Sequence, residues 1–335
     1  MLSYRRDSGR QSGFPLLACA DPCRFSGYRS LDLPILTPIH IFPFETTFRT
    51  RSVAMQPIPR IPGYQLLRRL GGGPMTSVFS ARALDTDAAC AVKLLRDDWD
   101  DADTGIKLLQ REARAGLGVR HPHLVRVSHA HVTAPPYFLV MDLLPGESLR
   151  RRLRRDFRLP VSEAVWIIRQ ISEALVALHT AGFLHGDIKP DNVRLIDDGT
   201  AVLIDLGFAH RPGENAAFLR AGYVLGTANY LAPEQCDPLP AEELSSDLFS
   251  LGVMFFEMLT GRLPYPPGSL RQTFRRHRCD PPADIRRSVV NLPASLIALI
   301  ERLLAHRPEN RPVAASVVQQ LIKLEIATLT RRRSA

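Results

Sequence analysis

The pattern of apolar residues changes part-way along this chain, and this change limits the folds that it can adopt. Five short runs, rich in β-branched and apolar residues and bounded by Gly, Pro or Asp, lie at 64–70, 78–82, 89–96, 124–130 and 137–143. A helical pattern interrupts them, because Ile106, Leu109, Ala113 and Leu117 recur at helical spacing before His121. We therefore expect a small antiparallel sheet accompanied by one helix.

Beyond Pro160 the pattern becomes mainly helical. Apolar residues from Val165 to Leu178 recur at helical spacing, and shorter helical patterns lie at 247–260, 294–304 and 313–325. A hairpin pattern at 193–204 surrounds Asp198-Gly199. The sequence thus predicts an α+β fold of two lobes: a small antiparallel sheet lobe with one helix (64–143) and a larger, mainly helical lobe (144–325). A cleft between two lobes is a common ligand site.

The two ends of the chain differ from this central region. Residues 1–60 contain eight arginines against four acidic residues, with scattered Pro and Gly and no clear periodicity, so we expect a basic, disordered extension. Met55 is an alternative start of translation. The stretch from Phe14 to Ala20 is similar to a signal peptide, but it is short and contains Pro15. Residues 326–335 are expected to form a basic tail.

Composition narrows the class of protein. The chain is 45% hydrophobic and 23% charged, which is typical of soluble globular proteins, and no apolar run approaches the roughly 20 residues of a membrane-spanning helix. Its five cysteines show no Cys-x-x-Cys spacing, which favours neither a disulfide framework nor a zinc site and indicates a cytoplasmic location. The net charge of +9 comes mostly from arginine, because only four lysines are present: Lys93, Lys107, Lys189 and Lys323.

The most informative motif runs from His185 to Asn192 and reads HGDIKPDN. Asp205-Leu206-Gly207 follows 13 residues after Asn192. Phosphoryl transfer needs a carboxylate that accepts the proton of the attacking hydroxyl, a cation for the transferred group and oxygen ligands for magnesium. Asp187, Lys189, Asn192 and Asp205 are candidates for these roles. Taken alone, the motif is also consistent with a polar loop that leads into a hairpin.

A glycine-rich turn joins the first two expected strands. Gly71, Gly72 and Gly73 lie in the stretch 70–78, where backbone amides without a neighbouring Cβ can approach phosphate oxygens. Lys93 lies on the third expected strand, and Glu112 lies on the helical face that should turn toward the sheet. The simpler alternatives are an ordinary hairpin turn and a solvent-facing glutamate paired with a nearby arginine.

Together these motifs resemble the eukaryotic-type protein kinase family, and bacterial serine/threonine kinases in particular, over about residues 64–325. The resemblance implies that the loop from Gly71 to Val78 covers the phosphates of ATP. Lys93 would contact the α- and β-phosphates and pair with Glu112. Met141 would lie at the back of the adenine pocket, and the hinge Asp142 to Leu144 would offer backbone hydrogen bonds to adenine.

The resemblance also implies the groups that transfer the phosphate. Asp187 would be the catalytic base, Lys189 would support the γ-phosphate, and Asn192 and Asp205 would bind Mg²⁺. Asp-x-Lys-x-x-Asn is associated with serine/threonine kinases, and Thr227 fits the same interpretation. The expected cofactors are ATP and Mg²⁺, and the expected partners are protein substrates with Ser or Thr hydroxyls.

Further along the chain, residues 226–234 read GTANYLAPE, which is similar to the family's segment after the magnesium-binding aspartate. Asp247 and Gly252 fall where the family has a helix-anchoring Asp and a Gly. Arg311 falls where the family has an arginine that pairs with the Glu of Ala-Pro-Glu, here Glu234. A small-molecule phosphotransferase, the more distant alternative, is not expected to contain this set.

Some positions depart from the family pattern. Thr76 replaces the third glycine of the loop and Pro74 stiffens it, so the affinity for ATP is open. Gly186 replaces an arginine that binds a phosphorylated activation loop in many members. Between Asp205 and Gly226 the only hydroxyl side chain is Tyr223. We therefore expect activity that does not depend on phosphorylation of this loop.

A basic cluster follows the hinge: Arg150, Arg151, Arg152, Arg154, Arg155 and Arg158. It is either a solvated helix face or a site for an acidic partner. No nucleic-acid-binding module accompanies it, so nucleic acid is not an expected partner. The departures at Thr76 and Pro74 leave one alternative function, a pseudokinase that binds nucleotide or a partner without transferring phosphate.

Overall fold

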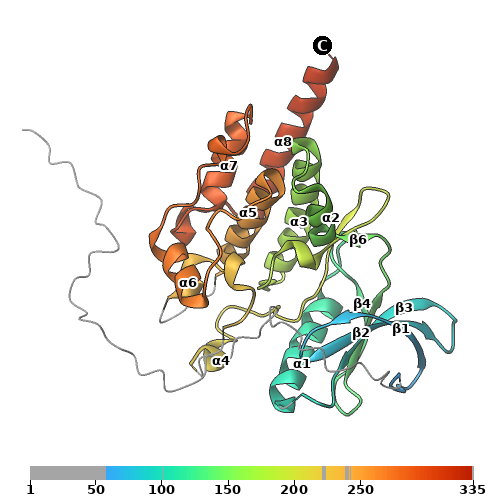
Figure 1. Ribbon diagram of the computed structural model, residues 1–335. Coiled ribbons are helices and arrows are strands. Elements are labelled where there is room, and N and C mark those ends of the chain that lie inside the picture. Colours follow the sequence, from blue (N-terminus) through green and yellow to red (C-terminus); the bar gives the residue numbers. More distant parts are fainter. Residues whose placement is uncertain (1–57, 100, 221–223, 238–240, 242, 334–335) are drawn as a thin grey trace, which may run out of the picture. The chain divides into compact units, whose positions relative to one another are not determined.

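The computed structural model describes residues 58–99, 101–220, 224–237, 241 and 243–333, all within one compact unit. The predicted extension up to residue 57, with Met55, and the loop residue Tyr223 lie outside the described residues. The first part of the chain forms a five-stranded antiparallel sheet in the order β1-β2-β3-β5-β4 (Figure 1). Its strands are β1 (Tyr64–Gly72), β2 (Thr76–Ala83), β3 (Ala89–Leu95), β4 (Val127–His131) and β5 (Phe138–Asp142).

Side-chain alternation divides the residues of this sheet between two apolar clusters. On one face Phe79, Val92 and Val140 pack together. On the other face Leu139 packs against Leu109 of helix α1 (Ala102–Gly118). Since neighbouring residues on a strand point to opposite faces, Lys93 lies on the side that α1 covers. The predicted sheet with one helix is confirmed.

β4 begins at Val127, three residues later than the sequence pattern predicted. Leu124 forms a parallel bridge with Leu203, and the amide of Val125 donates to the carbonyl of Leu203 at 2.8 Å. These backbone groups are therefore paired with β8 (Ala201–Leu203), outside the five-stranded sheet. β8 belongs to a three-stranded sheet with β6 (Glu147–Ser148) and β7 (Val193–Leu195), in the order β6-β7-β8.

The second part of the chain is mainly helical, as predicted. Its helices are α2 (Leu149–Asp156), α3 (Val161–Thr180), α4 (Ala216–Arg220), α5 (Leu244–Thr260), α6 (Leu270–Cys279), α7 (Ala294–Leu303) and α8 (Ala314–Arg333). α3 contacts both α5 and α8, and Figure 1 shows these helices side by side. Ile168, Ile171, Leu175 and Leu178 of α3 are fully buried in the main core, which is the predicted apolar face.

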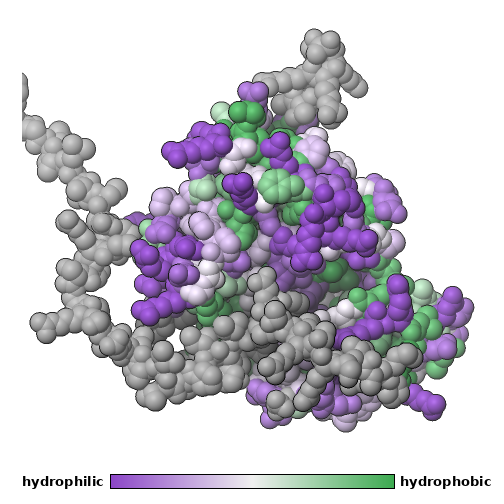
Figure 2. Space-filling view, in the orientation of Figure 1, coloured by the Kyte–Doolittle hydropathy of each residue, from purple (hydrophilic) through white to green (hydrophobic). Residues whose placement is uncertain are grey.

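One helix extends further than its apolar pattern indicated. α8 continues from Ala314 to Arg333, so residues 326–333 are helical where a tail was expected. No Gly or Pro interrupts this segment. α8 also packs against α3, and this tertiary contact stabilises the helix although the apolar pattern does not continue to its end. Among the described residues, no helix is both long and apolar enough to span a membrane. Figure 2 shows one face of the molecule, where the surface of the described residues is mainly hydrophilic.

Candidate active site

Lys93 lies at the centre of a buried group of charges. Its Nζ lies 2.7 Å from Oε2 of Glu112 on α1 and 2.6 Å from Oδ1 of Asp205, which follows β8. Lys93 and Glu112 are both buried. The register places Val78 of β2 directly opposite Lys93 of β3, so the end of the glycine turn lies beside the lysine. The structure therefore brings together four predicted site residues from separate segments.

The protonation states in this group follow from burial and from the neighbouring charges. Burial alone would lower the pKa of Lys93, but Asp205 and Glu112 outweigh it, so the pKa lies above its ordinary value and the ammonium is charged. Burial would raise the pKa of Asp205, but Lys93 and the amide of Gly207 lower it to about 2. For Glu112 burial dominates and raises the pKa despite Lys93. At neutral pH Lys93 is therefore a cation and Asp205 is ionised, and Lys93 Nζ donates to both carboxylate oxygens of Glu112.

A second group of polar side chains surrounds Asp187. Nζ of Lys189 lies 2.7 Å from Oδ2 of Asp187 and donates to Oγ1 of Thr227 at 2.6 Å. The Thr227 hydroxyl donates to Oδ1 of Asp187 at 2.7 Å, and Nδ2 of Asn192 donates to Oδ2 at 2.9 Å. Each carboxylate oxygen of Asp187 thus has a donor, and the carboxylate has one fixed orientation.

The backbone before Asp187 is fixed from α5. The carboxylate of Asp247 accepts from the amides of His185 at 2.8 Å and Gly186 at 3.0 Å, and its Oδ2 lies 2.9 Å from Nε2 of His179. Burial would raise the pKa of Asp247, but the contact with His179 and these amides lower it, so the carboxylate is charged. Asp247 of α5 therefore holds the backbone that precedes Asp187 in place.

The glycine turn has a geometry that only glycine allows at one position. Gly72 has a φ of +139°, and a Cβ there would lie 2.3 Å from the carbonyl oxygen of Thr76. The amide of Gly73 donates to the same oxygen at 2.9 Å. Thr76, which replaces an expected glycine, begins β2 and is buried. A backbone hydrogen bond between Gly73 and Thr76 therefore closes the turn, although Thr76 stands where a glycine was expected.

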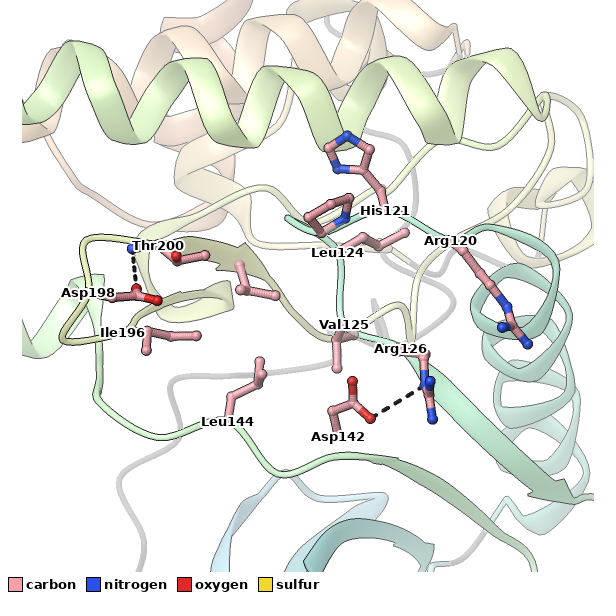
Figure 3. Close-up of a pocket in the computed structure, with 12 residues that line it drawn as sticks. Arg120, His121, Leu124, Val125, Arg126, Asp142, Leu144, Ile196, Asp198 and Thr200 are labelled. Atoms are coloured by element: carbon pink, nitrogen blue, oxygen red, sulfur yellow. Dashed lines mark hydrogen bonds and ion pairs between the residues drawn. The ribbon is translucent and has the colours of Figure 1, made fainter.

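The hinge residues lie at the end of β5. Met141 is opposite Ala91 of β3, and Oδ1 of Asp142 lies 3.5 Å from Nε of Arg126. The side chains of Asp142 and Leu144 line a surface pocket of about 490 Å³, together with the turn between β7 and β8 and the residues before β4 (Figure 3). This pocket does not include the phosphate-transfer groups around Lys93 and Asp187, so it is a different cavity from the expected nucleotide site.

Two oxygen-bearing side chains are suited to magnesium. Asp205 has a φ of +66° and offers a carboxylate, and Asn192 is buried beside Asp187. Carboxylate and amide oxygens are the ligands that Mg²⁺ prefers, and Mg²⁺ usually completes its shell with water and substrate phosphates. In the described part of the chain, no three His, Cys, Asp or Glu side chains form a metal site. Asp205 and Asn192 offer such oxygens, so these two residues fit a magnesium ion.

The sequence analysis did not identify a network around Arg150. Its guanidinium donates to Oε1 of Glu257 at 2.5 Å, to the Tyr230 hydroxyl at 2.5 Å and to Oδ2 of Asp191 at 3.0 Å. The network joins α2, α5, the loop of residues 185–192 and the segment after Thr227. Its members are far apart in sequence, and Arg150 lies within a run of arginines that a sequence pattern cannot distinguish from one another.

The predicted partner of Arg311 is confirmed by contact. Nη1 and Nη2 of Arg311 bind Oε1 and Oε2 of Glu234 at 2.6 and 2.7 Å. The guanidinium also donates to the carbonyls of Ser245, Ala305 and His306. This side chain is completely buried and connects the segment after the catalytic loop to the helical lobe.

Comparison with known proteins identifies the family of this chain. A family model described as "Protein kinase domain" matches residues 64–322. The chain belongs to the protein kinase domain family. It is similar to serine/threonine-protein kinase PrkC of Bacillus subtilis, with 31% identity over 79% of the chain and 41% of that protein. It is also similar to PknD of Mycobacterium tuberculosis, at 32% identity over 75% of the chain and 38% of that protein.

A third relative, serine/threonine-protein kinase PkaB of Streptomyces coelicolor, is 34% identical over 71% of the chain and 58% of its own length. The kinase chain therefore spans between about two fifths and three fifths of the length of these three relatives. The fold is that of a protein kinase, with an antiparallel sheet lobe and a helical lobe, as predicted.

Proposed function

We propose that this chain is an ATP-dependent serine/threonine protein kinase that transfers the γ-phosphate of ATP to Ser or Thr hydroxyls of proteins. The observation that carries this proposal is the orientation of Asp187 by Thr227, Asn192 and Lys189. The three relatives described above are named serine/threonine-protein kinases. A pseudokinase does not need a carboxylate that is oriented in this way.

In the proposed mechanism, Asp187 orients the attacking hydroxyl and accepts its proton. Its carboxylate accepts hydrogen bonds from Thr227 and Asn192, so it is pre-positioned and need not reorganise during the reaction. Lys189, with its ammonium 2.7 Å from Asp187, supplies a positive charge next to the transferred group. Most of the rate enhancement then comes from positioning and charge stabilisation.

Lys93 would bind the α- and β-phosphates from the other side of the site. Glu112 fixes the Lys93 side chain by accepting from Nζ at 2.7 and 3.0 Å. Asp205 and Asn192 would bind Mg²⁺, which when present neutralises charge on the phosphate oxygens. Gly71, Gly72, Gly73 and Val78 would cover the phosphates. Met141 would lie at the back of the adenine pocket, and the backbone of the hinge from Asp142 to Leu144 would offer hydrogen bonds to adenine.

We further propose that activity does not require phosphorylation of the loop after Asp205. Gly186 has no side chain that could bind a loop phosphate, and residues 206–225 contain no Ser or Thr. A cytoplasmic location, favoured by the cysteine pattern, is part of the same proposal.

An acidic partner at the cluster from Arg150 to Arg158 would compete with contacts inside the chain. Arg150 binds Glu257 and Asp191, and Arg155 binds Glu147 at 2.8 Å. Arg152 also pairs with Asp156. The cluster therefore supports such a partner only weakly, and the sequence-based prediction of one stays a prediction.

The test is transfer of labelled γ-phosphate from ATP with Mg²⁺ to the protein itself and to a basic protein acceptor. Asp187→Asn removes the proton acceptor, and Asp198→Asn makes the same change at an exposed turn as a matched control. We expect label on Ser or Thr with the wild type and with Asp198→Asn, and none with Asp187→Asn. A wild type that binds ATP but transfers no phosphate to either acceptor would overturn the proposal in favour of a pseudokinase.

A further inference from the structure

Two arginines of α1 contact the segment that follows Asp205. They are Arg111 and Arg114, and they meet Glu214 and Asn215 just before α4. We call these four residues the α1 clamp. The clamp lies outside the groups that would contact ATP or substrate, and the sequence analysis did not single out any of its members.

Arg111 makes the better-buried half of the α1 clamp. Its Nη1 donates to Oδ1 of Asn215 at 2.5 Å, and its Nη2 donates to the carbonyl of Glu214 at 2.6 Å. Asn215 is 2% exposed, and the guanidinium lies 5.1 Å from the centre of the Phe218 ring in α4. Because Arg111 both donates hydrogen bonds and stacks on an aromatic ring, it fixes α1 relative to the segment from Glu214 to Phe218.

Arg114 and Glu214 make the charged half. Nη2 of Arg114 donates to both carboxylate oxygens of Glu214, at 2.8 and 2.6 Å, and the amide of Arg211 donates to Oε2 at 2.9 Å. Burial would raise the pKa of Glu214, but the Arg211 amide and Arg114 lower it, so Glu214 is ionised at neutral pH. Arg114 and Arg211 also lie over the ring of Phe183, at 5.5 and 5.0 Å.

The α1 clamp affects the contact between Glu112 and Lys93 because Arg111, Arg114 and Glu112 are all on α1. Glu112, which binds Lys93, is the residue next to Arg111. The amide of Leu206 donates to Glu112, so the same segment contacts α1 at both ends of the 206–215 stretch. An α-helix moves largely as a rigid body, so the position of Arg111 and Arg114 determines the position of Glu112.

We propose that Arg111, Arg114, Glu214 and Asn215 are positioning residues that fix α1 where Glu112 can pair with Lys93. In kinases this arrangement commonly depends on loop phosphorylation. Here the carboxylate of Glu214 supplies a permanent negative charge for an α1 arginine, in place of a phosphate. This inference rests on the proposed kinase activity and explains how that activity becomes independent of loop phosphorylation.

The test compares charge reversals with a charge swap. Arg114→Glu and Glu214→Arg each place like charges together, whereas the double variant restores an opposite pair. We expect each single variant to lower kcat and to raise KM for ATP, with a fall in kcat/KM of about tenfold, because neighbouring charged residues couple at this level. The double variant should regain most of the loss. Lys107→Gln, which removes an exposed cation from the same helix, should behave as wild type.

Further readouts separate positioning from general stability. Asn215→Leu, which leaves the charges unchanged, should also raise KM for ATP, and phosphatase treatment should not alter wild-type activity. Single variants with wild-type kcat/KM would overturn the proposal, and so would a double variant that is as impaired as the single variants. An inactive wild type would instead refute the proposed function, so the two failures are distinguishable.

Discussion

Replacing Arg311 by leucine should destabilise the helical lobe strongly. The Arg311 side chain is completely buried, and its guanidinium makes two bonds to Glu234 and three to backbone carbonyls. Among the residues that the structure describes, leucine would leave Glu234 with the Ser246 hydroxyl, at 2.7 Å, as its remaining side-chain donor. Breaking a buried pair by removing one partner costs about 3–5 kcal/mol, because an uncompensated charge stays buried.

The electrostatic loss should exceed any gain from the apolar leucine side chain. The destabilisation by Arg311→Leu is measured as the change in the free energy of unfolding, from urea denaturation followed by circular dichroism. Arg286→Leu is a matched control, because Arg286 and Glu301 also form a 2.6 Å pair but are 54% and 51% exposed. An exposed pair of this kind contributes about 0–1 kcal/mol.

A double variant sharpens the test of the same reasoning. Glu234→Gln removes the charge that Arg311→Leu leaves unpaired, so the two changes together should cost less than the sum of the separate changes. A loss below about 1 kcal/mol for Arg311→Leu, equal to that of Arg286→Leu, would refute the argument that burial sets the magnitude.

The other predictions concern the two groups of the active site. Thr227→Val removes the hydroxyl that contacts Asp187 and Lys189, so kcat should fall by about tenfold or more while Thr227→Ser retains most activity; equal kcat values for both variants would contradict this. Asp205 has a pKa of about 2 against an ordinary 3.8, so its charge stabilises the fold fully above pH 4 and this stabilisation is lost as the pH falls toward 2. The difference in free energy of unfolding between wild type and Asp205→Asn should therefore be constant from pH 8 to 5 and shrink below pH 4. A difference that stays constant down to pH 2, or that changes in favour of the wild type as the pH falls, would show that Lys93 does not lower this pKa.

The sequence predicted the elements whose residues have a strong pattern of their own. The apolar pattern at 89–96 predicted the third strand, with Lys93 on it, and the motif from Asp187 to Asn192 holds both of these residues in one short segment. Apolar spacing likewise predicted α3, because one side of that helix is buried along its whole length. In these cases local sequence and tertiary contacts specify the same structure.

Other elements lack such a pattern. In α6 only Thr273 and His277 are buried, so its sequence has no apolar stripe, and in α2 the buried residues are Leu149 and Leu153 alone. The α1 clamp was also beyond prediction, since its members are about 100 residues apart and each is an ordinary surface residue type. Their proximity is a product of the whole fold.

The backbone at Gly186 has a consequence for how this chain can change. Its φ is +78°, and a Cβ there would lie 2.8 Å from the carbonyl oxygen of Phe208 and 3.3 Å from the Phe208 side chain. A larger residue at this position would therefore displace the segment after Asp205, and an arginine could not be introduced there without a local rearrangement. Engineering an on-switch into this kinase should accordingly start at Glu214, where a serine or threonine would have Arg114 within reach.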